Sequence, residues 1–321
     1  MNDGINSGFL TVAGSTLNQM LRSATPVALA ALGGLLTEHA GIMNIGMDGM
    51  ILMGAFVAAA ASMLLASAAL GMLAAIAFGI IVGLFFALFV VKLRSDEFIV
   101  GCALNTLALG LTGYFARSWF GTDGIKDAPY FAKISIPLIK DMPVLGTMLS
   151  GHSLLVYATW LLVFLMWLFV YRTPTGFWIR AAGESPETLR TAGKNPERMK
   201  WIASVLCGML CGLSGAFLSL GNLNGRFVEN MASPRGYIAF ACVIFGAANP
   251  VKAFLAALMF GFFEALGDQF QGLIRSDLPF AYLMKAIPYV ITVVMMVYVV
   301  VSGQRKRERI AKKQLELLET K

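Results

Sequence analysis

The sequence predicts an all-α polytopic membrane protein, a transmembrane helical bundle of about eight or nine spans. Of its 321 residues, 58% are hydrophobic and only 13% are charged, whereas a soluble domain carries about 25% charged residues. A bilayer admits only helices or closed barrels as spanning structures. The apolar runs here are much longer than the roughly ten-residue strands of a barrel.

Nine apolar runs approach or reach the roughly 20 residues that a helix needs to cross a bilayer. They are Gln19–Leu36, Gly49–Leu70, Gly71–Val91, Phe98–Trp119, Ser153–Tyr171, Trp201–Gly221, Gly236–Ala248, Val251–Gly267 and Leu283–Ser302. The seventh run is short and is followed by Asn249-Pro250, which predicts a half-helix or a re-entrant segment. Nine crossings would place the two chain ends on opposite sides of the membrane.

Lys and Arg predict the orientation of these runs. They are more frequent in the connections that follow the third, fifth, seventh and ninth runs than in the others. Cytoplasmic loops are enriched in these residues, so we expect the C-terminus inside and the N-terminus outside. The net charge of +7 then reflects orientation, not nucleic-acid binding. Met1-Asn2-Asp3-Gly4 lacks the positive start of a cleavable signal peptide.

No linker marks a second domain. Residues 1–303 are therefore predicted to form a single transmembrane domain with a cytoplasmic loop at 172–200, and residues 304–321 to form a charged cytoplasmic tail. Gly208, Gly212, Gly215 and Ala216 give the sixth span a face of small residues, which predicts close helix packing.

The polar loop 172–200 contains two consecutive helix-start signals. Ser185-Pro186-Glu187 places Ser at the N-cap and Pro at the first helical position. Gly193 can end that helix, and Asn195-Pro196-Glu197 starts the next one. A short helix, Pro186–Ala192, is predicted between two spans. Because so short a helix barely forms alone, it indicates a surface that docks on a cytoplasmic partner; the alternative is an ordinary solvated loop.

Neutral and acidic side chains occur at or near membrane depth. Asn44 and Asp48 lie in a glycine-containing break between the first two spans, either lining a polar cavity or forming a turn that Asp48 caps. Asn105, in the middle of the fourth span, either bonds neighbouring helices or lines a path. Asn222 and Asn224 follow the sixth span, where they contact a polar solute or cap a turn.

Intramembrane acids suggest cation coupling, and Glu264 and Asp268 lie four residues apart in the eighth run. They support the alternative that the protein is an ion-coupled secondary transporter, although no series of further acidic residues accompanies them. Metal ligation is not expected, because the two histidines are far apart and all four cysteines lie in apolar runs. The chain also lacks the phosphate-binding pattern G-x-x-x-x-G-K-[ST] and any evident catalytic triad, so it is expected to be non-catalytic.

Three blocks in matching order resemble bacterial ABC-importer permeases of the nucleoside and simple-sugar branch, within the branched-chain amino acid and ribose permease superfamily. EHAGIMNIGMDGMILMGAF resembles "ER-x-G-x-x-NIG-x-EG-x-x-L-x-GAF", and IRAAGESPETLRTAGKN resembles the coupling loop "RA-x-GENP-x-A-x-x-x-GI". SPRGYIAFACVIFGAANPVKAFLAALMFGFFEAL resembles "GRGYIALA-x-VIFG-x-W-x-P…FG-x-x-x-AL". His39, Asp48 and Ala248 depart from these patterns. A "GGIDLSVGS"-like run is absent, which favours nucleosides over free pentoses.

The resemblance implies a permease subunit of the bacterial inner membrane that moves a polar solute, with a nucleoside as the expected solute and a simple sugar or branched-chain amino acid as the alternative. It implies a separate cytoplasmic ATPase that holds ATP and Mg, a second permease in a heterodimeric pore and an extracytoplasmic solute-binding protein. The residues expected to couple to the ATPase are Arg180, Ala182, Gly183, Glu184, Ser185, Pro186, Ala192 and Gly193. The residues expected along the translocation path are Asn44, Asp48, Asn105, Asn222 and Asn224.

Overall fold

The computed structural model describes residues 2–121, 127–134, 150–232 and 234–273, together with Ile125, Met148, Val290 and Val294. It divides into two units, Met1–Phe262 and Phe263–Lys321; the contacts below belong to the first. In the described part of the chain, seven helices are long and apolar enough to cross a membrane. They are α1 (Asn2–His39), α2 (Met47–Leu64), α3 (Ala68–Ala87), α4 (Glu97–Phe120), α6 (Leu154–Arg172), α9 (Pro196–Ala216) and α11 (Pro250–Leu273).

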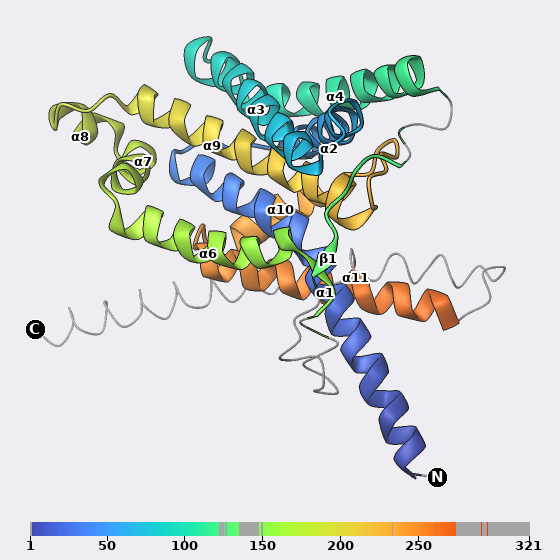
Figure 1. Cartoon of the computed structure of the whole chain (residues 1–321). Helices are drawn as coiled ribbons and strands as arrows, with labels where there is room; N and C mark the ends of the chain where they lie inside the picture. Colours follow the sequence, from blue (N-terminus) through green and yellow to red (C-terminus); the bar gives the residue numbers. More distant parts are fainter. Residues whose placement is uncertain are drawn as a thin grey trace, which may run out of the picture. The chain divides into compact units, whose positions relative to one another are not determined.

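Shorter elements connect or extend these helices (Figure 1). The π-helical turns η1 (Leu88–Lys92) and η2 (Phe217–Asn222) prolong α3 and α9. Helices α7 (Pro174–Glu184) and α8 (Pro186–Thr191) follow α6, and α10 (Arg235–Phe245) precedes α11. Strands β1 (Lys133–Ile134) and β2 (His152–Ser153) form one antiparallel pair, which was not predicted.

The predicted spans agree with the observed helices, but the boundary between the second and third is wrong. The break between α2 and α3 was placed at Leu70-Gly71, but α2 ends at Leu64 and Ser67 is the N-cap of α3. The turn carries no Gly or Pro as a signal, and Ala66 takes a φ of 48° instead. Gly71 lies inside α3, where an added Cβ would come within 2.6 Å of the Ala58 carbonyl oxygen. The ninth run and the tail fall almost entirely outside the described residues.

Helix α10 is the predicted half-helix. Its eleven residues span about 16 Å at 1.5 Å per residue, roughly half of the 30 Å hydrocarbon layer. A non-helical segment, 223–232, follows the end of η2, and Pro234 directly precedes α10. Such backbone is tolerated at membrane depth only where protein buries it or water reaches it.

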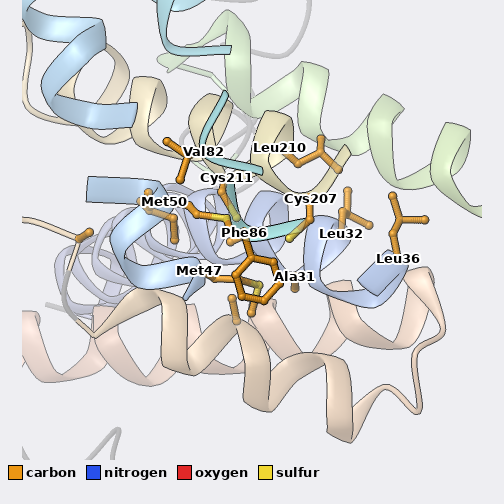
Figure 2. Packing of buried hydrophobic residues seen from close by; sticks show 14 of the residues in the cluster. Ala31, Leu32, Leu36, Met47, Met50, Val82, Phe86, Cys207, Leu210 and Cys211 are labelled. Carbon is orange, nitrogen blue, oxygen red and sulfur yellow. The ribbon is translucent and has the colours of Figure 1, made fainter. Parts of the chain in front are cut away.

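Helix α9 lies at the centre of the first unit and packs against α1, α2 and α3. The predicted small-residue face makes this possible. A Cβ added to Gly208 would collide with the Gly79 carbonyl oxygen, and one added to Gly212 would collide with Ala75. The neighbouring core is filled by larger side chains from four helices, among them Phe86, Met47 and Leu210 (Figure 2). Cys207 and Cys211 are fully buried there, as small apolar residues.

Candidate functional site

The break between α1 and α2 begins with a glycine-dependent helix end. Gly41 has a φ of +71°; its N–H bonds to the Glu38 carbonyl at 3.0 Å, and the N–H of Ile42 bonds to the Thr37 carbonyl at 2.9 Å. This pair of bonds is the Schellman motif, which needs a left-handed residue after the helix. The chain then runs without helix to Met47, leaving backbone groups that need other partners.

Asn44 supplies one of these partners from inside the break. Its side-chain oxygen accepts the N–H of Gly46 at 3.0 Å, and its amide nitrogen lies 3.3 Å from the sulfur of Cys207. The residue is 1% exposed. In this conformation Asn44 therefore fixes the break against α9 and presents no free polar surface.

Asp48 caps the half-helix from a distant part of the chain. Its Oδ1 accepts the N–H of Gly236 at 2.9 Å, whereas the N-cap of α10, Pro234, makes no side-chain cap bond. A carboxylate at this position also interacts favourably with the helix dipole. The contact requires a glycine, because a Cβ on Gly236 would collide with the backbone of Asp48.

Asn105 joins three elements at the same junction. Its Oδ1 accepts the N–H of Gly49 at 2.8 Å, at the start of α2. Its Nδ2 donates to the Ile45 carbonyl at 3.1 Å and to the Tyr237 hydroxyl at 2.9 Å. Asn105 lies about 12 Å along α4 from Glu97 at 1.5 Å per residue, near the middle of this candidate span. Asn105 is half-buried and Tyr237 is exposed, so the pair forms an exposed polar edge of the junction.

Asn222 and Asn224 belong to a separate polar group, at the far end of α9. The side-chain oxygen of Asn222 accepts a hydrogen bond from Arg22 Nη2 at 2.9 Å. Asn224 is exposed and has a φ of +51°, a conformation that Asn tolerates better than most residues. The predicted path residues are thus divided: Asn44, Asp48 and Asn105 share one junction, and Asn222 and Asn224 lie elsewhere.

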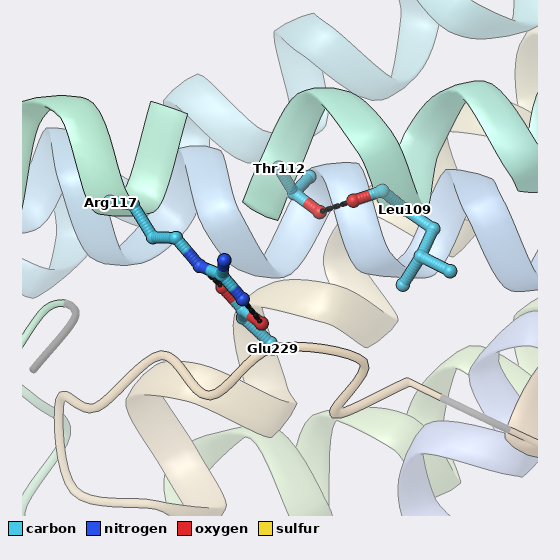
Figure 3. Close-up of polar contacts among 4 residues, drawn as sticks. All are labelled: Leu109, Thr112, Arg117 and Glu229. Carbon is cyan, nitrogen blue, oxygen red and sulfur yellow. Dashed lines mark hydrogen bonds and ion pairs between the residues drawn. The ribbon is translucent and has the colours of Figure 1, made fainter. Parts of the chain in front are cut away.

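Arg117 and Glu229 form an ion pair that the sequence did not predict. The Arg117 Nε and Nη2 lie 2.6 and 2.8 Å from the two carboxylate oxygens of Glu229 (Figure 3). Arg117 holds the pKa of Glu229 below its usual value. The pair borders a cavity of about 660 Å³ along α4. Arg117 ends a span and Glu229 lies in a loop 112 positions away, so no spacing in the sequence connects them.

The predicted coupling loop contains two helices, not one. The unpredicted α7 begins at Pro174, with Thr173 Oγ1 accepting the N–H of Gly176 at 3.2 Å. Helix α8 begins at Pro186 as predicted and ends at Thr191, one residue before the predicted Ala192, which is its C-cap. Ser185 is at the N-cap but makes no cap bond to the backbone; its Oγ lies 2.7 Å from Thr188 Oγ1.

The predicted helix boundary signals after α8 are confirmed. Gly193 has a φ of +76°. Its N–H bonds to the Arg190 carbonyl, and the N–H of Lys194 bonds to the Leu189 carbonyl, which completes a second Schellman motif. Asn195 Oδ1 accepts the N–H of Glu197 at 2.9 Å at the start of α9.

Buried contacts attach α7 and α8 to the bundle, at one end of α6 and α9 (Figure 1). Ala182 is fully buried, and a Cβ added to Gly183 would collide with the His39 carbonyl oxygen at the end of α1. The guanidinium of Arg180 lies 5.2 Å from the ring centre of Tyr171. Leu189 is the buried anchor of α8.

The outer surface of this pair of helices remains available to a partner. Glu184, Ser185 and Ala192 are exposed, whereas Pro186 is half-buried. Pro186 borders a cavity of about 490 Å³, which is also lined by charged residues such as Arg94, Glu97 and Lys200. Ala182 cannot contact a partner directly, so it supports this surface from beneath. Among the described residues, no group of His, Cys, Asp and Glu could hold a metal ion.

Several known transport proteins are similar in sequence to this chain. Residues 16–300 match the model of the family described as branched-chain amino acid transport system / permease component. The guanosine ABC transporter permease protein NupQ of Bacillus subtilis is 34% identical over 84% of this chain and 87% of its own. The nucleoside ABC transporter permease protein NupC of Lactococcus lactis is 30% identical over 86% and 89%. The putative glucose ABC transporter permease protein TsgC13 of Haloferax volcanii is 28% identical over 93% and 95%.

The first two organisms also supply a second, more distant match. These are the guanosine permease protein NupP, 24% identical, and the nucleoside permease protein NupB, 23% identical. No solved structure is significantly similar to this chain.

Proposed function

Because the chain belongs to the family of branched-chain amino acid transport system permease components, we propose that it is the transmembrane subunit of an ATP-driven nucleoside importer. The observation that carries the nucleoside assignment is its similarity, at 30% identity or more over most of both chains, to permeases named for guanosine and nucleosides. The uncharged Asn105–Tyr237 edge near the middle of the candidate span α4 suits a neutral solute with hydroxyl groups and a base edge, because no charge has to be desolvated there.

The exposed surface of α7 and α8 is the proposed docking site for a cytoplasmic ATPase. Glu184, Ser185 and the solvent side of α8 would contact the ATPase, while Gly183 and Leu189 transmit its movement to α1 and to the bundle. ATP and Mg would be held by that separate chain. The basic loops support a cytoplasmic location for this end of the bundle, with the N-terminus outside.

A second permease of the same family is the proposed partner within the membrane. The pairs NupQ with NupP and NupC with NupB support a heterodimeric pore, since both members of each pair resemble this chain. An extracytoplasmic solute-binding protein would deliver the nucleoside to the opposite end from α8.

Uptake by the reconstituted complex tests the function directly. The chain, its second permease, the ATPase and the binding protein are placed in proteoliposomes, and labelled guanosine, uridine, ribose, glucose and leucine are offered in turn. ATP-dependent uptake of the nucleosides is expected, in preference to the others. The glucose-permease relative makes sugar uptake the competing outcome. Nucleoside uptake that persists without ATP and follows an imposed ion gradient would instead indicate a secondary transporter.

A further inference from the structure

The cavity beside Arg117 has chemical features that packing of the bundle does not require. It measures about 660 Å³ and lies along the half of α4 that leads away from the Asn105–Tyr237 edge. Gly110 and Gly113 form part of its wall. A Cβ added to Gly110 would meet no atom within 4 Å, so this glycine is not needed for close helix packing and leaves the cavity open.

Tyr114 lines the same cavity and is 65% exposed. An exposed aromatic ring in a partly polar cavity is suited to stacking on a planar heterocycle, because every nucleobase has a π-face. A free sugar has no such face.

The Arg117–Glu229 pair supplies hydrogen-bonding groups to the same cavity. Two of the five guanidinium N–H donors of Arg117 bind Glu229, which leaves others for a ligand. Each carboxylate oxygen of Glu229 retains a second lone pair. The bidentate contact fixes both groups, and their charges cancel, so the pair offers donors and acceptors to a ligand without net charge.

We propose that the cavity formed by Gly110, Gly113, Tyr114, Arg117 and Glu229 is a recognition site for the base of a nucleoside at the extracytoplasmic end of the path. Tyr114 stacks on the base, Arg117 and Glu229 bind its edge, and the two glycines leave room for it. The site rests on the proposed function. It goes beyond that function by placing the selection of nucleosides over sugars in the permease itself.

The test uses the complete complex in proteoliposomes with one preparation of unaltered binding protein, so every difference between variants arises in the permease. Tyr114→Ala is expected to raise the KM for guanosine by about tenfold, the effect of one lost base–aromatic contact, and Tyr114→Phe is expected to recover most of that loss. Gly110→Leu, which fills the cavity, should reduce uptake to a similar or greater extent. Leu107→Ala, an exposed change on α4 outside this cavity, is the matched control.

The ion pair is tested by a charge swap. The double variant Arg117→Glu with Glu229→Arg retains an ion pair but exchanges the positions of donors and acceptors, so its guanosine uptake should be lower than that of the wild type. Wild-type uptake in the double variant would show that the pair is purely structural and would overturn the assignment. Loss of the second permease from the purified Gly110→Leu or Tyr114→Ala complex would overturn it too, by identifying the cavity as a subunit interface. A wild-type complex that imports no nucleoside refutes the proposed function, whereas nucleoside uptake unaffected by Tyr114→Ala and Gly110→Leu refutes only this site.

Discussion

Asn105 illustrates what one side chain can contribute to a break in a membrane bundle. The sequence left two roles open for it, bonding between helices or lining a path. Its three hydrogen bonds, to Gly49, Ile45 and Tyr237, show that it bonds elements together. The half-buried position beside exposed Tyr237 keeps the second role as a proposal, since the two roles are compatible at one residue.

Replacing Asn105 with Ala is expected to destabilise the complex by about 1–3 kcal/mol, because the Gly49 N–H and the Ile45 carbonyl lose their partner within the protein. Thermal unfolding of the purified complex measures this loss. Thr106→Ala is the control, since the Thr106 hydroxyl bonds to the Cys102 carbonyl of its own helix. Equal melting temperatures for the two variants would contradict the bridging role.

Two glycines allow a matched comparison of backbone contact. Gly236→Ala should disrupt folding or assembly, because its Cβ would collide with Asp48. Gly110→Ala should be neutral or stabilising, since its Cβ meets nothing within 4 Å and Ala favours a helix over Gly by about 1 kcal/mol. Yield and elution volume after detergent extraction distinguish the two. A well-assembled Gly236→Ala complex would show that α10 can shift away from Asp48 at little cost.

His152 predicts a pH dependence of stability. Burial is the main factor that holds its pKa below the ordinary value of 6.5, and the nearby Arg22 also lowers it. Below pH 6.5 the unfolded chain therefore binds a proton that the folded chain does not bind. The contribution of neutral His152 to the free energy of unfolding is complete above pH 6.5 and declines as the pH falls below it. The melting temperature should drop between pH 7.5 and 5.5, and His152→Asn should reduce that drop. An unchanged drop in melting temperature in His152→Asn would show that other titrating groups cause it.

At the scale of elements, helix ends were predicted more accurately than helix partners. Gly193 and Asn195 act through bonds to residues within four or five positions, so their roles could be recognised in the sequence. Asp48 caps α10 across 188 positions, and nothing local indicates that partner. Helix α7 was missed because Pro174 and Gly176 at its start are typical of loops; buried Ile179 and Ala182 stabilise it through contacts that only the fold provides.

The coupling surface yields the prediction at this scale. Glu184→Arg reverses an exposed charge at the end of α7, so the permease should fold and reach the membrane while solute-stimulated ATP hydrolysis by the complex is lost. Lys92→Glu, an exposed charge reversal in η1, is the matched control and should retain stimulation. Wild-type stimulation in Glu184→Arg would remove this residue from the ATPase contact.

At the scale of the whole molecule, the distribution of Lys and Arg predicts which end of the bundle faces the cytoplasm. Reporter fusions inserted at Asp127 and Lys194 should therefore report opposite sides of the membrane, with Lys194 inside. The two sites are separated by α6 and by the α7–α8 surface, so a single crossing decides the result. Reporters on the same side would refute the nine-crossing topology.

The close approach of Gly41 and Gly183 has a mechanical consequence. A Cβ on Gly41 would lie 3.1 Å from the Gly183 Cα, so these two segments of the chain are in direct backbone contact. Side chains between two elements can change rotamer and absorb a small displacement, whereas backbone atoms in direct contact have no such compliance. Helix α7 and the end of α1 thus meet at a stiff pivot. If the proposed ATPase displaces α8, the displacement would reach α1 almost undiminished. A substitution that makes this contact more compliant would then reduce coupling without weakening the docking itself.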